Sequence, residues 1–380
     1  MGGFYEFFAG GGMARAGLGA GWDCLFANDF DPKKAAAYAA NWGDDDLFVG
    51  DVATLSSDQL PDHADLAWAS FPCQDLSLAG DYVGLNGSRS GTFWPFWRLM
   101  KALMSEGRGP RVIVLENVYG AITSNGGKDF QAIASAFSGE KYTFGAMVMD
   151  ARHWVPQSRP RLFFVGVRRD VSIAPAFHGE ASKAWHPRAL VEAVDGMSQA
   201  AKNRWVWWNL PAPAKRVVNF IDVIEDAPVG CKWHTKKETD YLISLMAARN
   251  LQKLQDAIAS TKANKSRMVG GVYRRTRNGQ QRAEIRFDDI AGCLRTPSGG
   301  SSRQTIMLVE NGKVKSRLLS PREAARLMGL PEDYRLPERY NDAYHVCGDG
   351  VAVPAVRHLA KNLIEPILQD ADAVSLAAAE

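Results

Sequence analysis

Short, mostly apolar runs alternate with helix-like stretches through the first 168 residues of the chain. Runs of this kind are typical of strands that are buried on both faces of a sheet. They occupy residues 4–8, 24–27, 47–49, 66–70, 112–115 and 162–167. Strands separated by helical crossovers pair in parallel, so the pattern predicts an α/β fold with a Rossmann-like, mostly parallel sheet.

The alternation fades after about residue 170, where we expect a second, smaller domain. This part contains closely spaced tryptophans, a helix-like stretch at residues 240–258 and a strongly basic region. Helix signals return at Ser320, a capping residue followed by Pro321, and a last amphipathic pattern covers residues 353–368. The expected parts are residues 1–175, an inserted domain at 176–344, and a segment at 345–380 that returns to the first domain.

Composition narrows the classes of site and compartment. The 380 residues are 46% hydrophobic, which is enough for a large core, and the length suits two domains or one large domain carrying an insertion. The five cysteines are widely spread with no Cys-x-x-Cys pair, so we expect no metal and no disulfide framework, and a functional cysteine would act alone as a nucleophile. No apolar run approaches the roughly 20 residues that span a bilayer, and no cleavable leader is recognised, so we expect a cytoplasmic protein without a membrane partner.

Polar and small residues follow the first three predicted strands. A glycine-rich turn after the first strand lets the backbone pass close to a ligand, while the acid and the aromatic ring after the second strand suit a ribose and an adenine. For each position alone, an ordinary turn or helix cap is the alternative. No lysine follows the glycines, which disfavours a phosphate site. The predicted nucleoside-binding residues are Phe8, Ala9, Gly10, Gly12, Asp29, Phe30 and Asp51.

Three further strand ends carry reactive or charged groups. Cys73 closes the fourth strand, and Pro72 stops that strand so that the sulfur lies in an exposed turn, although an inert buried cysteine is the usual alternative. Glu116 ends the fifth strand, where a carboxyl group could hold a proton or could simply face solvent. Arg159 and Arg161 alternate before the last strand, so we expect both to project on one side and to bind anionic or carbonyl oxygens.

Six short blocks occur in an order and spacing that resemble the DNA (cytosine-5) methyltransferase family. The resemblance covers nearly the whole chain except residues 170–316, and the ordered set is far more specific than any one block. The blocks are Phe8-Ala9-Gly10-x-Gly12, Pro72-Cys73-Gln74, Glu116-Asn117-Val118, Gln157-x-Arg159-x-Arg161, Pro321-Arg322-Glu323 and Gly348-x-Gly350-Val351.

The resemblance implies a class I S-adenosylmethionine-dependent methyltransferase fold and a covalent mechanism. Cys73 would add to C6 of a flipped-out cytosine so that C5 can accept a methyl group. Glu116 would hydrogen-bond and protonate N3, Arg161 would bind O2, and Arg159 would support the cysteine side of the pocket. S-adenosylmethionine would be the donor, S-adenosylhomocysteine the product, and no metal would be needed.

The resemblance also assigns the cofactor residues. The glycine turn would line the methionine end, Asp29 would bind the ribose, and Phe30 and Asp51 would bind the adenine, with Pro72, Asp349 and Val351 completing the set. This sequence departs from the usual pattern at Glu6, where Asp is common, at Met13, where Gly is common, and at Asp349, where Asn is common. The extra carboxylate of Asp349 would either favour the sulfonium of the donor or repel its carboxylate.

The variable middle of the chain suits duplex DNA. Residues 262–286 hold eight lysines and arginines against Glu284 alone, a composition that fits phosphate and guanine contacts better than a solvated helix face does. The glycine-rich segment 77–92 resembles the loop that closes over DNA in the family, and Thr305 with Ile306 fits its backbone contact beside the flipped base better than Thr296 does. The predicted DNA-binding residues are Gln74, Ser77, Ser88, Arg89, Arg274, Arg275, Arg277 and Thr305.

The resemblance therefore predicts a monomeric, bacterial or phage-encoded enzyme that acts on duplex DNA, with a cognate restriction endonuclease as a possible partner. Three alternatives stay open. The RNA-methylating branch shares the catalytic blocks, but its typical Cys-Phe-Thr tripeptide is absent here. An inactive DNA-binding regulator would not need Cys73, and a nicotinamide-dependent oxidoreductase would leave Pro72-Cys73-Gln74 unexplained.

Overall fold

A computed structural model describes residues 2–72, 92–277, 279–295 and 303–377 of the chain. The chain divides into two compact units, and each is described by itself. Unit 1 comprises residues 1–150, 160–213 and 355–380, and unit 2 comprises residues 151–159 and 214–354.

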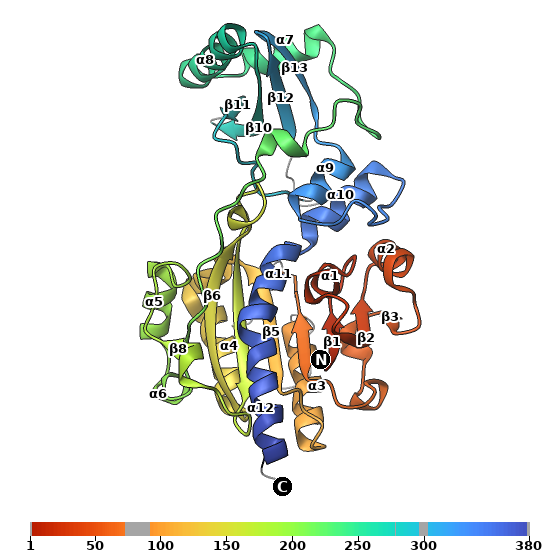
Figure 1. Ribbon diagram of the computed structural model, residues 1–380, viewed down its shortest axis with the longest axis vertical. Coiled ribbons are helices and arrows are strands. Elements are labelled where there is room, and N and C mark those ends of the chain that lie inside the picture. The colour runs from red at the N-terminus through yellow and green to blue at the C-terminus, as the bar shows by residue number, and fades with distance from the viewer. Residues whose placement is uncertain (1, 73–91, 278, 296–302, 378–380) are drawn as a thin grey trace. The chain divides into compact units, whose positions relative to one another are not determined.

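Unit 1 is built on a seven-stranded sheet in the order β3-β2-β1-β4-β5-β7-β6 (Figure 1). Neighbouring strands from β3 to β5 pair in parallel, and β7 pairs antiparallel with both β5 and β6. This confirms the expected Rossmann-like, mostly parallel sheet, to which β6 adds a strand that the apolar runs did not predict. The strands are β1 (Gly3–Phe7), β2 (Asp23–Asp29), β3 (Leu47–Val49), β4 (Leu66–Ala69), β5 (Val112–Val118), β6 (Tyr142–Asp150) and β7 (Pro160–Arg168).

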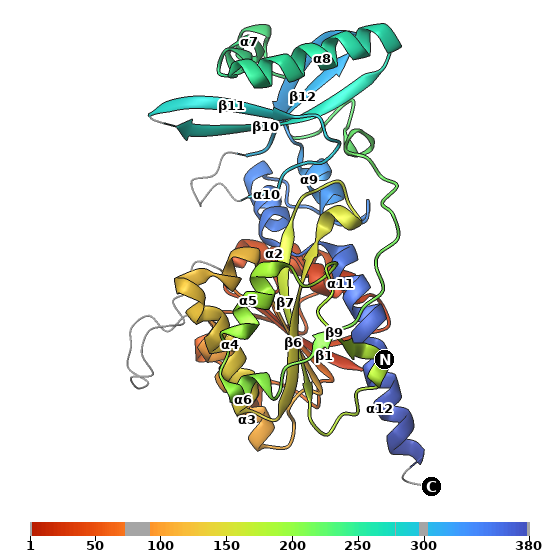
Figure 2. The same ribbon diagram turned by 90° about the vertical axis from the view of Figure 1, so that its left-hand side faces the viewer.

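Helices cover both faces of this sheet. Figure 2 shows α3 and α4 on one face and α11 with α12 on the other. The first face holds a large aromatic core in which Phe7 of β1 packs against Phe96 of α3. On the second face, Glu365 of α12 accepts a hydrogen bond from Trp22 Nε1 at 3.1 Å. The helices are α1 (Met13–Leu18), α2 (Pro32–Trp42), α3 (Phe93–Ser105), α4 (Lys128–Gly139), α5 (Arg188–Asp195), α6 (Gln199–Lys202), α11 (Val353–Leu359) and α12 (Glu365–Ala377), with a π-helical turn at Ala360–Ile364 between the last two.

The tryptophan-rich segment belongs to unit 1, whereas the inserted domain was expected to begin at residue 176. Its two short strands, β8 (His178–Gly179) and β9 (Trp207–Trp208), pair with each other. Trp205 forms a bridge with Phe144 of β6, and Trp208 Nε1 donates to the carbonyl of Val165 in β7 at 3.1 Å. These contacts bury the segment against the sheet, and the longer part of unit 2 begins only at residue 214.

Unit 2 contains a four-stranded antiparallel sheet in the order β11-β10-β12-β13. Helices α7 (Lys236–Ser244) and α8 (Ala248–Asn264) occupy the expected helical region and pack on one face of this sheet, where Leu254 and Ile285 lie in a shared apolar core. The strands are β10 (Arg267–Arg277), β11 (Gln280–Arg286), β12 (Thr305–Glu310) and β13 (Lys313–Leu318).

Two more helices complete unit 2, α9 (Pro321–Leu327) and α10 (Tyr340–Asp349). Ser320 caps α9 as expected, because its Oγ accepts from Glu323 N at 3.1 Å while Ser320 N donates to Glu323 Oε2 at 2.7 Å. Glu323 is also paired with Arg317 at 2.5 Å, and both side chains are fully buried. Within the described part of the chain, no helix is both long enough and apolar enough to span a membrane.

Candidate functional site

Polar side chains gather where the parallel strands of unit 1 end. Strands β3, β2, β1, β4 and β5 are consecutive neighbours in the sheet, so the residues that follow them lie along one edge. In open α/β folds this carboxyl edge is the ligand-binding edge. The sequence prediction placed its nucleoside-binding and reacting residues at the same five strand ends.

The turn after β1 has an unusual backbone. Phe8 and Gly10 both have a φ of 58°, a left-handed conformation that is uncommon outside glycine. Ala9 N donates to the carbonyl of Asn28 at 2.9 Å, and Gly10 N donates to Asp29 Oδ2 at 2.8 Å. The turn is therefore held against the end of β2 by two hydrogen bonds.

Gly10 and Gly12 of this turn are required for different structural reasons. At Gly12 a Cβ atom would lie 2.3 Å from Trp42 Nε1, so the position admits no side chain while Trp42 packs there. At Gly10 a Cβ atom would meet no atom of the described chain within 4 Å. Gly10 thus borders open space, as expected if a ligand passes close to the backbone.

Asp29 and Phe30 present opposite properties at the end of β2. Asp29 is buried, and its Oδ1 accepts from Asp31 N at 2.8 Å while Oδ2 accepts from Gly10. Burial raises the pKa of this carboxyl and the two backbone amides act against that shift. A carboxylate has about four lone-pair sites, so Asp29 can still accept ribose hydroxyls. Phe30 is 70% exposed, an unfavourable position for a phenyl ring unless a ligand covers it.

Asn28 is a positioning residue that the sequence did not single out. Its buried side chain donates from Nδ2 to Phe48 O at 3.1 Å and to Gly50 O at 2.9 Å, which fixes the end of β3 beside β2. Asp51 follows directly, is exposed, and accepts from Ala53 N at 2.9 Å as the cap of a short 3-10 helix. The helix cap that was the simpler interpretation of Asp51 is present, and it does not prevent a further contact to adenine.

These strand ends fit a nucleoside. They supply a close-approach glycine turn, a buried acid, an exposed aromatic ring and a second acid on neighbouring strands. Together they match the donors, acceptors and stacking face of an adenosyl group.

Glu116 and Arg161 form an ion pair within unit 1. Glu116 lies near the end of β5 and Arg161 near the start of β7, and Arg161 Nε is 3.1 Å from Glu116 Oε1. Both side chains are largely buried, with exposed fractions of 7% and 13%. The pair therefore holds a carboxyl and a guanidinium in fixed orientations at the edge of the sheet.

Asn117 connects the ends of β5 and β4. Its Nδ2 donates to the carbonyl of Phe71 at 3.0 Å, and its Oδ1 accepts from Val118 N at 2.8 Å. Phe71 and Pro72 are the last described residues before the segment that contains the proposed nucleophile. The amide of Asn117 thus fixes the chain one residue before Pro72.

Arg159 differs from expectation because strand β7 begins only at Pro160. Strand alternation therefore does not extend to Arg159, which belongs to unit 2 while Arg161 belongs to unit 1. The Arg159 side chain is 1% exposed and donates to the carbonyls of Leu294 at 3.1 Å, Gly348 at 2.7 Å and Gly350 at 2.6 Å. These bonds hold the segment at Leu294 and the C-terminal end of α10 in place.

Gln157 acts in the same way. It is fully buried, its Oε1 accepts from Leu294 N at 3.1 Å, and its Nε2 donates to Leu327 O at 2.7 Å. In the Gln157-x-Arg159 block, both named side chains therefore hold backbone segments of unit 2 in place through hydrogen bonds. The sequence pattern did not indicate this role.

The remaining predicted residues fall in unit 2 or outside the described chain. Asp349 is the exposed last residue of α10, Val351 is buried, and Thr305 is the buried first residue of β12. Arg274 and Arg275 are exposed on β10, and the backbone of Arg277 pairs with Gln280. Outside the described residues lie Cys73, Gln74, Ser77, Ser88 and Arg89.

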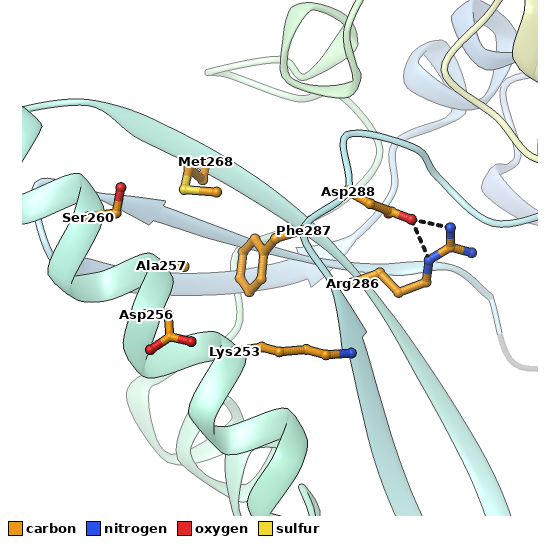
Figure 3. Close-up of a pocket in the computed structure, with 8 residues that line it drawn as sticks. All are labelled: Lys253, Asp256, Ala257, Ser260, Met268, Arg286, Phe287 and Asp288. Atoms are coloured by element: carbon orange, nitrogen blue, oxygen red, sulfur yellow. Dashed lines mark hydrogen bonds and ion pairs between the residues drawn. The ribbon is translucent and has the colours of Figure 1, made fainter.

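A cavity of about 510 Å³ lies elsewhere in unit 2, between α8 and the sheet (Figure 3). Two cations and two carboxylates line it, so its charge favours neither an anion nor a cation. Arg286 Nε donates to Asp288 Oδ2 at 3.0 Å across its rim. The lining residues are Lys253, Asp256, Ala257, Ser260, Met268, Arg286, Phe287 and Asp288.

Comparison with known proteins agrees with these features. The sequence profile of the C-5 cytosine-specific DNA methylase family matches residues 3–365. The chain is 24% identical over 362 residues to the Type II methyltransferase M.HhaI of Haemophilus parahaemolyticus, which covers 95% of this chain and 93% of that protein. It is 25% identical over 378 residues to the Type II methyltransferase M.HpaII of Haemophilus parainfluenzae, covering 96% of this chain and 89% of that protein.

A solved structure supports the fold. The Entamoeba histolytica methyltransferase EhMeth matches with a TM-score of 0.61 at 14% identity, covering 97% of this chain and 98% of that one. At this identity the likeness concerns the fold alone.

Proposed function

This chain belongs to the C-5 cytosine-specific DNA methylase family and is a DNA (cytosine-5) methyltransferase, and we propose that it methylates a flipped-out cytosine in duplex DNA through a covalent bond to Cys73. The observation that carries the proposal is the buried Glu116–Arg161 pair at the edge of the sheet.

Cytosine C5 is a poor nucleophile in the intact aromatic ring. In the proposed mechanism the Cys73 thiolate adds to C6, the ring electrons move toward C5, and N3 takes up a proton. C5 would then bond to the methyl carbon that the cofactor supplies, as the bond between that carbon and the sulfonium sulfur breaks. Loss of the C5 proton to water then expels the thiolate, and N3 returns its proton to Glu116, which restores the aromatic ring and leaves 5-methylcytosine.

Glu116 and Arg161 supply the polar contacts for this step. The Glu116 carboxyl, after it has taken up a proton from solvent, donates that proton to N3, and the Arg161 guanidinium binds O2, so that both groups act on charge that develops as the cysteine adds. Their mutual contact at 3.1 Å fixes both side chains before the base arrives. We assign Arg159 a positioning role, because its guanidinium binds three backbone carbonyls of unit 2.

Both faces of a stacked cytosine are covered, so the base must leave the duplex for the sulfur and the methyl group to reach it. Extrusion costs a few kcal/mol of unstacking and unpairing. We propose that the segment around Ser77, Ser88 and Arg89, with Gln74 and Thr305, contacts the DNA and helps to hold the open state.

Membership of the family implies S-adenosylmethionine as the cofactor, which supplies an electrophilic methyl group on a sulfonium. Asp29 would accept the ribose hydroxyls, Phe30 would stack on the adenine, and Asp51 would accept from its amino group. The turn from Phe8 to Gly12 would line the methionine end, and Pro72, Asp349 and Val351 complete the proposed set. No step of this proposal uses a metal.

Duplex DNA is the proposed substrate. The relatives at 24% and 25% identity are named Type II methyltransferases, so we propose a cognate restriction endonuclease as a functional partner. Bisulfite sequencing of DNA from cells that express the chain would give the recognition sequence.

The covalent step is tested with duplex DNA that contains 5-fluorocytosine. Fluorine at C5 cannot leave as a proton does, so the elimination that releases the cysteine is blocked. The enzyme should therefore remain covalently attached to DNA in the presence of S-adenosylmethionine. Cys73→Ser should form no adduct, should reduce methyl transfer by at least about a thousandfold, and should still bind DNA. Cys231→Ser, a change at a half-buried cysteine of unit 2, is the control that should form the adduct.

Three outcomes would overturn the proposal. If the Cys73→Ser variant still transferred methyl groups, Cys73 would be excluded as the nucleophile. Radiolabel transferred to transfer RNA but not to duplex DNA would favour the RNA-methylating alternative, and absence of label on both would favour an inactive DNA-binding regulator.

A further inference from the structure

Strands β10 and β11 extend beyond the rest of their sheet. β12 pairs only with residues 267–272 of β10, whereas residues 273–277 pair only with β11. Figure 2 shows the two strands running on as a ribbon. We call residues 273–284 the hairpin arm. It carries Arg274, Arg275, Arg277 and Arg282 against Glu284 alone, and Gly279 near its turn has a φ of 73°.

The two faces of the hairpin arm differ. Directly opposed residues of an antiparallel pair share a face, and successive residues of one strand lie on opposite faces. Val272 and Ile285 are opposed and lie in the apolar core with α8, so Arg274, opposed to Ala283, belongs to the face that the helices cover. Tyr273, Arg275, Arg282 and Glu284 belong to the other face.

Arg275 is directly opposite Arg282 on this second face. Opposed residues have Cβ atoms about 4.5–5.5 Å apart, and like charges in such positions destabilise a hairpin. The contacts of each arginine offset this repulsion only in part. Arg275 Nε is 3.7 Å from Glu284 Oε2, which is too long for a hydrogen bond, and Arg282 Nη2 donates to Gln280 Oε1 at 2.7 Å.

Ala283 N donates to Leu245 O at 3.0 Å and joins the base of the arm to the chain between α7 and α8, whereas the exposed side chains of Arg275 and Arg282 repel each other without stabilising the free protein. An anion between them would remove the repulsion and accept charge-assisted hydrogen bonds from both guanidinium groups. One phosphate group can lie between two directly opposed arginine side chains and accept hydrogen bonds from both. A two-stranded ribbon is also narrow enough to enter the major groove of DNA, where backbone phosphates line both rims.

We propose that Arg275 and Arg282 together bind one backbone phosphate of the DNA substrate, with the open face of the hairpin arm against the DNA. The inference rests on the proposed function for the identity of its polyanion. It selects Arg275 from the predicted DNA-binding arginines, adds Arg282 to them, and places Arg274 on the opposite face. A phosphate contact positions the protein without distinguishing the bases.

The test uses the salt dependence of duplex DNA binding by the full chain, measured by fluorescence anisotropy between 50 and 200 mM salt. Arg275→Gln and Arg282→Gln should each weaken binding by about tenfold at a fixed salt concentration, as for the loss of one charge-assisted contact. Because one phosphate is shared, the double variant should lower the slope of log K against log salt by about 0.9 rather than about 1.8. Arg249→Gln, an exposed arginine of α8 on the other side of the sheet, is the equal-charge control and should leave the slope unchanged.

A second readout separates a binding role from a structural one. Arg282→Gln relieves the like-charge pair, so the melting temperature of the free protein should rise or stay constant while DNA affinity falls. A slope that drops by about 1.8 in the double variant, no change in slope, or an equal effect of Arg274→Gln would each overturn the inference. Methyl transfer to DNA by the wild-type chain is measured in parallel, because its absence would overturn the proposed function, whereas its presence with unchanged slopes would overturn only the hairpin-arm proposal.

Discussion

Asp29 shows how one side chain at this edge can hold the backbone in place and still be available to the proposed ligand. Its two oxygens each accept a backbone amide, from Gly10 and Asp31, so it holds the glycine turn while keeping lone pairs for a ribose. Arg159 is the contrasting case, because its guanidinium fastens three carbonyls of unit 2. A motif residue can thus matter to a site without touching the ligand.

Glu6 leads to a pH prediction. This side chain of β1 is 1% exposed, and burial raises its pKa to about 8 from an ordinary value of 4.5, although Arg15 N donates to its Oε1 at 3.4 Å. Between these two values the folded protein keeps the proton that the unfolded chain has released, so the free energy of unfolding falls as pH rises. This decrease in the free energy of unfolding can reach about 1.4 kcal/mol per pH unit, and we expect the Glu6→Gln substitution to abolish it.

Urea unfolding of both proteins from pH 5 to pH 9 measures this difference. The wild-type chain should lose stability relative to Glu6→Gln up to about pH 8, and the two curves should run parallel above it. A constant difference over the whole range would contradict a raised pKa at Glu6.

At the scale of elements, β6 depends on the tryptophan-rich segment beside it. Phe144 N donates to Arg204 O at 2.9 Å and Val206 N donates to Phe144 O at 2.8 Å, so the segment continues the sheet past β6. A Cβ atom at Gly145 would lie 2.0 Å from Val206 O and 2.8 Å from Trp208 Nε1. This close approach explains a glycine in the middle of a strand.

Gly145→Ala should therefore destabilise unit 1. The added methyl group must push the segment away from β6, at an expected cost of about 1–3 kcal/mol. Thermal unfolding checks this, with Gly139→Ala as the control, because a Cβ atom at Gly139 meets no described atom within 4 Å. Equal melting temperatures for the two variants would show that the segment yields without cost.

At the scale of the whole molecule, the proposed adenosyl-binding strand ends and the hairpin arm lie on different units. The proposed cofactor residues at the ends of β1, β2 and β3 belong to unit 1, while the hairpin arm belongs to unit 2. The division differs from the expected boundaries at both ends of the inserted domain, because residues 176–213 pack on the sheet of unit 1 and residues 345–354 belong to unit 2.

Hydrogen exchange should give two separate footprints. S-adenosylhomocysteine is expected to slow amide exchange in residues 8–12 and 29–31, and duplex DNA in residues 273–284, because a bound ligand stabilises the amides that it contacts. Mass spectrometry of peptides from the full chain resolves both regions. Protection of the hairpin arm by S-adenosylhomocysteine alone would contradict the assignment of the arm to DNA.

The sequence by itself determined the family blocks, the strands β1 to β5 and β7, and the residues at their ends, because apolar runs and strand-ending turns are local patterns. The Ser320 cap could be predicted for the same reason. Only the tertiary structure decided that β6 is a strand, since its glycine and mixed residues gain their burial from distant partners. It also decided where the Arg159 guanidinium lies and which face of the hairpin arm carries Arg275 and Arg282, because strand register and long-range hydrogen bonds join residues that no local pattern relates.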